Sequence, residues 1–474
     1  MTTEVIPLSD QHFDVVVIGG GPAGYASALY GASAGLSIAL VEHNKIGGTC
    51  LNVGCIPAKE LLETASVFRT VSHAGDFGVV VDGIGLEWSR TQTRKQAIID
   101  QLVGGLTGLL KGRKVTLFDG TGRLASDHRT VAVSGGESGE VAITADSVIL
   151  AAGSLTRSLP GFPIDGQRIV TSDELLSIPE LPASAIVIGG GAIGCEFASM
   201  MSDLGTEVTI LEYMPKILPG CDVDVAKVVE RSFKKRKIDI RTGVSVQSQV
   251  TTDDGVTVTF GDAEQLTAET VVMSVGRRPA SETLGLENTA VQVDERGFII
   301  VDELCRTGAA GVWAVGDVID TAQLAHVGFA EGIAVISDIL GENPVPVDYG
   351  NVPWCIYCHP EVAFAGHSEE SAKEAGFDVV VSKHRFAGNG RAMIVGDTEG
   401  LVKIIAEKND DGTGGRILGV HMVGPWVTEQ LGQGYLAVNW EATVAEVAQF
   451  IQPHPTMSEL FGESVLALTG RSLH

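Results

Sequence analysis

Basic residues are scarce in this chain. Its 474 residues include 33 Lys and Arg against 59 Asp and Glu, which gives a formal net charge of −26 at pH 7. Nucleic acids and anionic membranes are bound by basic surfaces, so neither is expected as a partner. The charge allows docking of a basic protein, although a solvated acidic surface is the simpler explanation.

Long apolar runs and a secretory leader are also lacking. No apolar stretch reaches the roughly 20 residues that a transmembrane helix needs. No charged segment followed by an apolar run opens the sequence. We therefore expect a cytoplasmic protein. The length is too great for one hydrophobic core and predicts about two to four domains.

Cysteines are few and odd in number, which argues against a structural disulfide framework. In a reducing cytoplasm, a disulfide that does form points to catalysis rather than to structure. The seven cysteines are scattered over the chain: Cys50, Cys55, Cys195, Cys221, Cys305, Cys355 and Cys358.

Glycine, by contrast, is abundant, and two glycine-rich turns share one pattern. Each turn follows a strand-like apolar run and precedes a helix-like run, and the next strand ends in an acid, Glu42 or Glu212. In such βαβ units the glycines give a tight turn, room for a pyrophosphate and close helix packing. The sequence therefore predicts an α/β fold with two Rossmann-like dinucleotide-binding domains. The GxGxxG glycines are Gly19, Gly21 and Gly24 in the first turn and Gly189, Gly191 and Gly194 in the second.

The acid of the second unit bears on the choice of nucleotide. A carboxylate at Glu212 accepts a hydrogen bond from a ribose 2′-hydroxyl and repels a 2′-phosphate, so this site favours NAD over NADP. The alternative interpretation is an ordinary surface acid.

The segment 47–59 (GGTCLNVGCIPAK) carries two cysteines five residues apart, which we interpret as one redox dithiol. In a regular helix such residues lie roughly 8.6 Å apart, whereas a disulfide needs Cα atoms within about 7 Å. We expect Gly54 and Pro57 to distort the helix start. The helix dipole there would lower the pKa values of Cys50 and Cys55. The alternative is two unpaired buried thiols.

Lys59 follows the second cysteine by four residues. If the helix resumes there, Lys59 and Cys55 face the same side, and the ammonium group would stabilise a thiolate. A solvated lysine is the alternative.

Together these motifs resemble the FAD-dependent pyridine-nucleotide disulfide oxidoreductases, and among them the dihydrolipoamide dehydrogenases. The resemblance rests on segment 47–59, both GxGxxG turns and Ala314-Val-Gly-Asp317, and it covers nearly the whole chain. It implies FAD at the first turn, NAD at the second, and a homodimer. The implied segments are an FAD-binding part at 1–153, an NAD-binding domain at 154–279, a second FAD-binding or central part at 280–350, and a C-terminal α+β dimerisation domain at 351–474.

The resemblance also implies roles around the cysteine pair. Cys55 would lie nearest the flavin as the charge-transfer thiolate, and Cys50 would attack the substrate disulfide. Lys59 would lie near flavin N5, paired with Glu196. Further contacts to the flavin, or at its junction with the nicotinamide, would come from Gly153, Gly276, Arg277, Asp317, Ala325 and His326.

By the same resemblance His454 is the catalytic acid–base, supplied by the other subunit, and Glu459 orients its imidazole. Thr456 and Glu459 also fit a capping box, which would use the glutamate at a helix start instead. Gln452 stands where the family often has a histidine.

A second cysteine pair departs from the family pattern. Cys355, Cys358 and His359 formally match the CxxCH haem motif, an interpretation we reject because the segment fits the family's interface pattern and no export signal is present. A second dithiol or half of a metal site stays open.

The implied activity is oxidation of protein-bound dihydrolipoamide to lipoamide through the Cys50–Cys55 disulfide and FAD, with hydride passed to NAD⁺. Implied partners are the lipoyl and subunit-binding domains of a 2-oxoacid dehydrogenase complex. The alternative is an NAD(P)H-dependent reductase of another disulfide or of a metal ion. Glu212 argues against NADPH. Mercuric reductases carry a terminal cysteine pair, whereas no cysteine follows Cys358.

Overall fold

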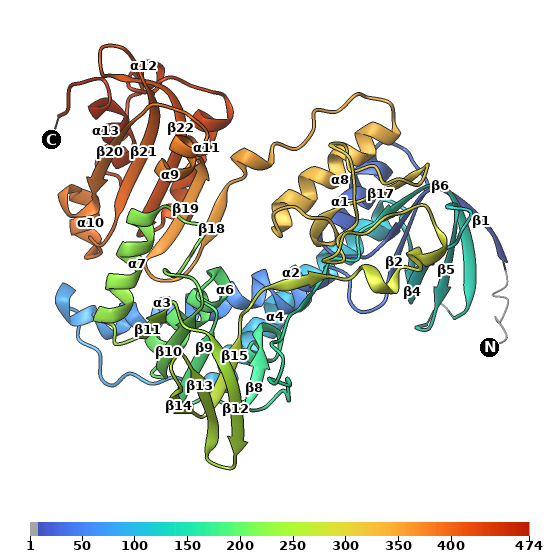
Figure 1. Cartoon of the computed structure of the whole chain (residues 1–474), viewed down its shortest axis with the longest axis horizontal. Coiled ribbons are helices and arrows are strands. Elements are labelled where there is room, and N and C mark those ends of the chain that lie inside the picture. The colour runs from blue at the N-terminus through green and yellow to red at the C-terminus, as the bar shows by residue number, and fades with distance from the viewer. Residues whose placement is uncertain (1–7, 138, 474) are drawn as a thin grey trace. The chain divides into compact units, whose positions relative to one another are not determined.

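The computed structural model describes residues 8–137 and 139–473, and it divides into two compact units that each gather separate stretches of chain. Unit 1 comprises residues 1–60, 89–157 and 276–349, and unit 2 comprises 61–88, 158–275 and 350–474. Helices and strands of both are labelled in Figure 1. The predicted α/β class is confirmed, because each unit contains a sheet of mainly parallel strands with crossover helices, and unit 2 also contains antiparallel sheets.

The main sheet of unit 1 contains the first predicted nucleotide turn. β1 pairs in parallel with β2 and β6, β6 pairs in parallel with β17, and β4, β5 and β6 are antiparallel neighbours. The order is β3–β2–β1–β6–β5–β4, with β17 beside β6. The bounds are β1 Leu8–Ile18, β2 Ile38–Glu42, β3 Thr116–Asp119, β4 Thr121–Leu124, β5 Thr130–Ser134, β6 Val141–Leu150 and β17 Val312–Ala314.

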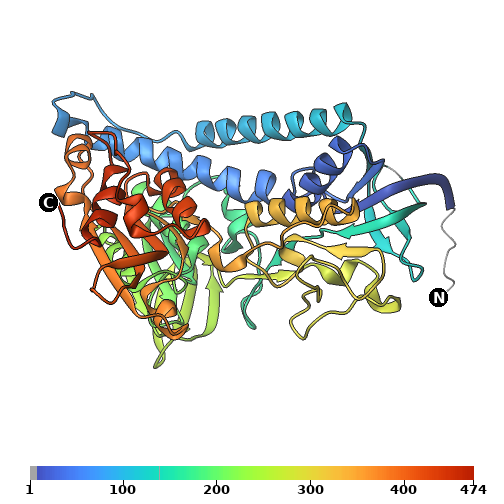
Figure 2. The ribbon, with the colours of Figure 1, turned by 90° about the horizontal axis from the view of Figure 1, so that it is seen from above.

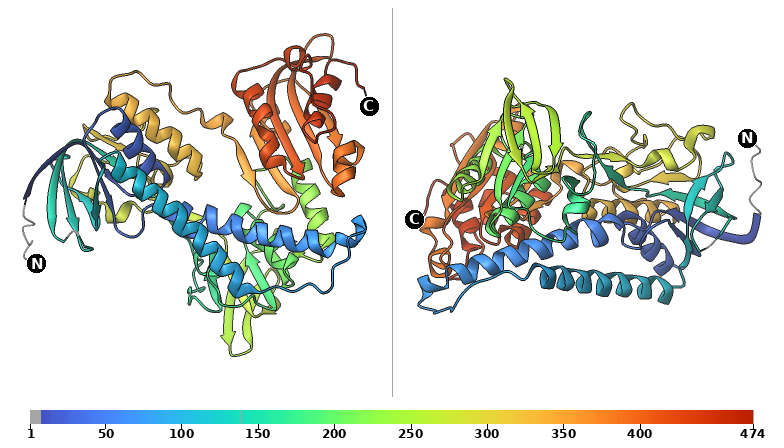
Figure 3. Two further views of the ribbon diagram at one scale, coloured as in Figure 1. Left: turned by 180° about the vertical axis from the view of Figure 1, so that it is seen from behind. Right: turned by 90° about the horizontal axis from the view of Figure 1, so that it is seen from below.

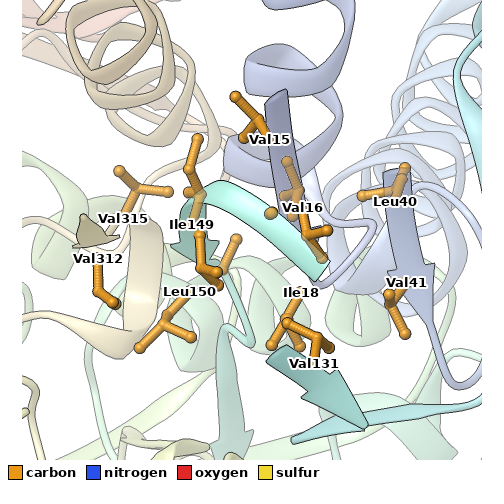
Figure 4. Close-up of a cluster of buried hydrophobic side chains, with 14 of the residues drawn as sticks. Val15, Val16, Ile18, Leu40, Val41, Val131, Ile149, Leu150, Val312 and Val315 are labelled. Carbon is orange, nitrogen blue, oxygen red and sulfur yellow. The ribbon is translucent and has the colours of Figure 1, made fainter. Parts of the chain in front are cut away.

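Apolar residues fill both faces of these central strands. Val15, Val16 and Val17 are fully buried, as are Ile149 and Leu150 on β6. Figure 4 shows such side chains from neighbouring strands packed into one cluster. Continuous apolar runs of this kind are typical of parallel strands that are covered on both faces.

Two helices of unit 1 approach each other closely because glycines lie between them. α1 (Pro22–Ser33) and α8 (Ala325–Ile339) lie side by side in Figure 1. A Cβ on Gly332 would come within 2.6 Å of Ser27 Oγ, and one on Gly328 within 3.0 Å of Ala23 Cβ. The helix after the first glycine turn, α1, is thereby held against α8.

Three further helices follow the second strand. Arg94 on α4, the long light-blue helix of Figure 2, forms an ion pair with Glu60 on α3. The bounds are α2 Gly48–Val53, α3 Cys55–Ser72 and α4 Trp88–Gly112.

Unit 2 repeats the βαβ arrangement in a second parallel sheet. β9 pairs in parallel with β10 and β15, and the order is β11–β10–β9–β15–β8. A separate antiparallel sheet has the order β12–β13–β14. The bounds are β8 Ile169–Thr171, α5 Ser172–Leu175, β9 Ser184–Ile188, α6 Ala192–Asp203, β10 Glu207–Glu212, α7 Val223–Lys235, β11 Asp239–Thr242, β12 Val246–Thr252, β13 Gly255–Phe260, β14 Glu264–Ala268 and β15 Thr270–Met273.

The C-terminal part of unit 2 is an antiparallel sheet covered by helices. Its order is β18–β19–β22–β21–β20, and the left view of Figure 3 shows its orange and red helices against the strands. Since α11 contacts β19 and β22 and α13 contacts β20 and β21, these helices close the core of this part. The bounds are β18 Trp354–Ile356, β19 Glu361–Gly366, α9 Glu369–Glu374, β20 Val379–Arg385, α10 Gly390–Val395, β21 Leu401–Lys408, β22 Gly414–Gly424, α11 Val427–Asn439, α12 Val444–Val447 and α13 Glu459–Ala467.

Within the described ranges, no helix is both long enough and apolar enough to cross a membrane.

Candidate active site

The first glycine turn has the geometry that a dinucleotide requires. Gly19 has a φ of +112°, and a Cβ there would lie 2.2 Å from Ala151 O. A Cβ on Gly24 would lie 1.8 Å from Gly19 O, so only glycine allows the helix and strand to meet here. Gly21 is the N-cap of α1 and offers no side-chain cap. The first N–H groups of α1 are therefore left for an anion such as a pyrophosphate.

Glu42 is fixed at this turn by two backbone groups. Its Oε2 accepts a hydrogen bond from Gly20 N–H at 2.6 Å, and its Oε1 accepts one from Asn44 N–H at 2.7 Å. These bonds hold the carboxylate beside the turn, where it can also accept from a ribose hydroxyl.

The second turn reproduces this geometry in unit 2. A Cβ on Gly189 would lie 2.3 Å from Ser274 O, and one on Gly194 would lie 1.9 Å from Gly189 O. Gly191, the N-cap of α6, again provides no side-chain cap. Both turns therefore fit a bound dinucleotide.

Glu212 lies at the second turn in the same way as Glu42 lies at the first. Its Oε2 accepts from Gly190 N–H at 2.5 Å and its Oε1 from Met214 N–H at 2.6 Å. Only 7% of the residue is exposed. The interpretation of Glu212 as an ordinary surface acid is therefore wrong.

The cysteine-bearing segment is anchored directly on the first turn. Gly47 N–H donates to Gly20 O at 2.8 Å. Gly48 has a φ of +54°, and a Cβ there would lie 2.6 Å from Gly21 Cα. Asn52 Nδ2 closes the loop by donating to Gly48 O at 2.9 Å. The backbone of the cysteine-bearing segment thus packs directly on the backbone of the turn, and this contact positions the two cysteines.

The two cysteines lie on different helices. Cys50 belongs to α2, and Cys55 is the first residue of α3. Gly54 between them has φ −143° and ψ −111°, and a Cβ there would lie 2.9 Å from Thr49 O. The prediction that the pair cannot occupy one regular helix is confirmed. The expectation for Pro57 is wrong, because it lies in the first turn of α3, where a proline removes no helical hydrogen bond.

The structure holds this pair as thiols that interact with each other. The pKa of Cys50 is raised, first by its hydrogen bond with Cys55 and then by burial, while the positive charge of Lys59 opposes the shift. Our expectation of a lowered pKa is therefore wrong for Cys50. Burial and the nearby cysteines also raise the pKa of Tyr25, on α1, to about 12. Lys59 is half-buried on α3, one turn beyond Cys55.

A second polar group of unit 1 surrounds Asp317. Asp317 Oδ2 accepts from Ser154 Oγ at 2.5 Å. Arg277 donates through Nε to Ser154 Oγ at 2.7 Å and through Nη2 to Ser154 O at 2.8 Å. Arg277 lies on β16 (Arg277–Pro279), which pairs with β7 (Ser154–Thr156). The structure thereby brings Arg277 and Asp317 within 4.0 Å of each other.

The other predicted contacts of unit 1 lie on neighbouring backbone. Gly153 and Gly276 have φ values of +72° and +97°, and no atom lies within 4 Å of where their Cβ would be. Ala325 begins α8, and the next residue, His326, is exposed. Open space beside these glycines suits close approach of a ligand.

Sequence reasoning missed Glu331, which organises the Asp317 turn. It is fully buried on α8, and it accepts from Gly316 N–H at 2.6 Å, Thr321 Oγ1 at 2.9 Å and Tyr349 OH at 3.0 Å. Burial raises its pKa, although these hydrogen bonds oppose the shift. An acid in the middle of a mostly apolar helix was the available signal.

In unit 2, His454 and Glu459 form an acid–base arrangement. His454 Nδ1 lies 2.9 Å from Glu459 Oε2, and 78% of the histidine side chain is exposed. The buried Asn389 donates to Glu459 Oε1 at 3.2 Å and to Thr456 O at 3.0 Å. Thr456 Oγ1 accepts from Glu459 N–H at 3.2 Å, which is half of a capping box. The glutamate carboxylate itself is directed to His454.

Glu196 and the second cysteine pair belong to another part of unit 2. Glu196 is buried on α6 and its Oε1 accepts from Tyr357 N–H at 2.9 Å. Burial raises the pKa of Cys358 and lowers that of His359 to about 3. No group of three or more metal-ligating side chains occurs in the chain from 8 to 137 or from 139 to 473. The pairing of Glu196 with Lys59 stays a prediction.

Comparison with known families identifies the whole arrangement. The model described as pyridine nucleotide-disulphide oxidoreductase matches residues 13–332. The chain belongs to this family. The family's dimerisation domain matches residues 352–465, which supports a homodimer.

Relatives match this oxidoreductase over nearly its full length. Dihydrolipoyl dehydrogenase of Bacillus subtilis is 42% identical over 475 residues, which cover 98% of this chain and 99% of that protein. Dihydrolipoyl dehydrogenase of Zymomonas mobilis is 39% identical, with coverage of 98% and 99%. The crystal structure of LpdA from Mycobacterium tuberculosis superposes with a TM-score of 0.90 at 26% identity, with coverage of 97% and 99%.

Proposed function

We propose that this oxidoreductase is a dihydrolipoyl dehydrogenase, which oxidises dihydrolipoamide and reduces NAD⁺. The observation that carries the proposal is the Cys50–Cys55 pair, whose thiols interact next to a dinucleotide turn. Curated relatives at 42% and 39% identity bear this enzyme name.

The cofactors are FAD and NAD. The uncapped helix start at Gly21 and the carboxylate of Glu42 suit FAD, and Gly191 and Glu212 suit NAD. We assign FAD binding to segments 1–153 and 280–350, NAD binding to 154–279, and dimerisation to 351–474. Lys59, Asp317 and Arg277 would face the flavin, and Glu331 would hold the Asp317 turn.

The chain's own part in the reaction is thiol–disulfide exchange. His454, supplied across the dimer, takes the proton of a dihydrolipoamide thiol, with Glu459 stabilising the imidazolium. The resulting thiolate attacks Cys50 Sγ, which breaks the Cys50–Cys55 bond and releases Cys55 as a thiolate. The second substrate thiol then attacks the substrate sulfur joined to Cys50 and passes its proton to the departing Cys50 sulfur. This attack breaks the mixed disulfide and closes the lipoamide disulfide. Cys50 is left as a thiol, and His454 releases the first proton to solvent.

The pKa shift of Cys50 agrees with these roles. In the reduced pair Cys50 holds its proton firmly, because its hydrogen bond with Cys55 and its burial raise its pKa. When bound beside the first glycine turn, FAD would supply the two-electron redox chemistry between the cysteine pair and NAD⁺ that no side chain of the chain can supply.

The physiological partners follow from the substrate. We infer that lipoyl domains of a 2-oxoacid dehydrogenase complex deliver dihydrolipoamide and that a basic subunit-binding domain docks on the acidic surface, given the net charge of −26. Such docking weakens as salt rises. Cytoplasmic location stays a prediction.

One assay tests the proposed activity. Purified FAD-loaded protein is mixed with dihydrolipoamide and NAD⁺, and NADH formation is followed by absorbance. We expect turnover with NAD⁺ that greatly exceeds turnover with NADP⁺. Parallel reactions offer NADH or NADPH with glutathione disulfide or with mercuric ion. Turnover confined to either of those acceptors would replace the proposed function with the reductase alternative.

A further inference from the structure

One groove of unit 2 is lined by positive charge, although the chain as a whole carries −26. Its volume is 530 Å³, and it lies between α7 and β20. No residue of the second glycine turn lines it. Its basic lining residues are Lys227, Arg231, Lys234, Lys383 and Arg385.

Regular spacing places these cations on facing surfaces. Lys227, Arg231 and Lys234 occupy successive turns of one face of α7, about 6 Å and then about 4.5 Å apart along the axis. Lys383 and Arg385 alternate on β20 and so point to the same side of the strand. β20 is the edge strand of its sheet, and both side chains are exposed.

The acids of the groove leave most of this charge uncompensated. Asp224 already binds two lysines, Lys383 at 2.6 Å and the fully buried Lys403 at 2.8 Å. Glu230 is the other acidic lining residue.

Four of the five cations have no counter-ion. Lys227, Arg231, Lys234 and Arg385 are exposed, and none of them forms an ion pair with any residue that the structure describes. Like charges gathered in one concave surface repel each other unless an anion lies between them.

We propose that this groove binds a small molecule that carries two or more linked phosphates. Guanidinium groups recognise phosphate oxygens in bidentate fashion, and lysines add point charges. The volume lies within the range of small-molecule sites. The short intervals between the cations on α7 suit adjacent phosphates better than the wider spacing of carboxylates along an acidic peptide.

Calorimetry with sodium tripolyphosphate tests this assignment. The full-length protein carries FAD and is saturated with NAD⁺, so that both dinucleotide sites are filled. We expect one saturable site whose affinity falls as sodium chloride is raised. The double variant Arg231→Gln/Arg385→Gln should bind at least about tenfold more weakly, since each bond to a charged group contributes substantially.

A matched variant separates the groove from bulk charge. Arg90→Gln/Lys235→Gln also removes two positive charges, but from exposed residues that do not line the groove. The affinity of this variant for tripolyphosphate should stay within about twofold of the wild type. Thermal unfolding verifies that both variants fold. The proposal fails if the wild type shows no saturable binding, or if both variants lose affinity equally. It also fails if hexaglutamate binds and tripolyphosphate does not, since an acidic protein segment would then be the occupant.

Discussion

The two glycine turns are nearly the same in backbone and acid but differ in what covers them. In each, the carboxylate at the end of the next strand accepts a hydrogen bond from a backbone N–H of the turn. Gly20 donates to Glu42 at 2.6 Å, and Gly190 donates to Glu212 at 2.5 Å. In each, a following loop donates to that glycine's carbonyl: Gly47 N–H to Gly20 O at 2.8 Å, and Leu218 N–H to Gly190 O at 2.7 Å.

The covering loops explain the different chemistry. The first loop ends in Gly47 and Gly48, which lie on the turn and lead into the helix of Cys50. The second loop packs Ile217 over its turn, where its Cγ2 would lie 2.8 Å from a Cβ on Gly190. The two βαβ units share the same turn geometry. The loop after the second strand decides whether cysteines or an apolar side chain lie beside that turn.

The largest expected effect comes from exchanging the cysteine near each turn. Cys50→Ser should lower dihydrolipoamide-dependent NAD⁺ reduction by about a thousandfold or more, because no disulfide can form. Cys195 is fully buried and its thiol donates to Gly190 O at 3.3 Å. Cys195→Ser retains a donor and should stay within about threefold of the wild-type rate. NADH formation measures both, and a fully active Cys50→Ser enzyme would rule out the assigned exchange.

Next in size is the loss of backbone contact at the first turn. Gly48→Ala places a methyl group against Gly21 in a left-handed conformation, and it should reduce the free energy of unfolding by about 2 kcal/mol or more and weaken FAD retention. Gly220→Ala, in the loop after the second turn where no atom is near, is the control. The flavin-to-protein absorbance ratio and the thermal midpoint report the outcome. Equal flavin loss in both variants would show that the contact is not special.

A smaller effect should distinguish the two acids. Glu212→Gln should reduce the preference for NAD⁺ over NADP⁺ by about tenfold, since it removes the charge that repels a 2′-phosphate. Glu42→Gln should leave that preference unchanged and lower FAD content instead. The ratio of kcat/KM values for the two nucleotides measures the first effect. A preference that changes equally in both variants would contradict the assignment of NAD to the second turn.

The smallest effect concerns acid stability, in which the two units should respond in opposite directions. Hydrogen bonds from lysines lower the pKa of Glu369 to about 2, and they do so for Asp224 against the effect of burial. The ionised carboxylates of Glu369 and Asp224 stabilise the fold at pH values above their ordinary pKa values of 4.5 and 3.8. This stabilisation is lost as pH falls through about 2, the pKa of each group in the folded chain. The pKa of Glu331 is raised, so its contribution is present below 4.5 and lost as pH rises through the folded value.

Thermal midpoints measured from pH 2 to pH 7 test this contrast. Lys403→Met should flatten the acid limb of unit 2. Glu331→Gln should remove the gain on mild acidification in unit 1. Identical pH profiles for these variants and the wild type would contradict it.

Local pattern was enough for the strands, the glycine turns and their acids, because each depends on residues close in sequence. The same held for the break between Cys50 and Cys55, which follows from helix dimensions. Contacts between distant segments were not predictable. Asn389 reaches Glu459 across 70 residues, and Ser154 joins Asp317 across 163. The raised pKa of Cys50 could not be predicted from the helix start alone, because it depends on the hydrogen bond with Cys55 and on burial in the folded chain.

The contact of Gly48 with Gly21 limits how the cysteine loop can be transferred to another nucleotide-binding protein. A Cβ on Gly48 would lie 2.6 Å from Gly21 Cα, whereas one on Gly21 would lie 3.9 Å from Gly48 Cα, an ordinary contact distance. The steric constraint therefore falls on the cysteine loop, which must keep its glycine at position 48 wherever it is transplanted. A cysteine loop with alanine in place of Gly48 would be displaced from the glycine turn of any nucleotide-binding scaffold that received it. The thiols would then be present while their alignment with the cofactor was lost.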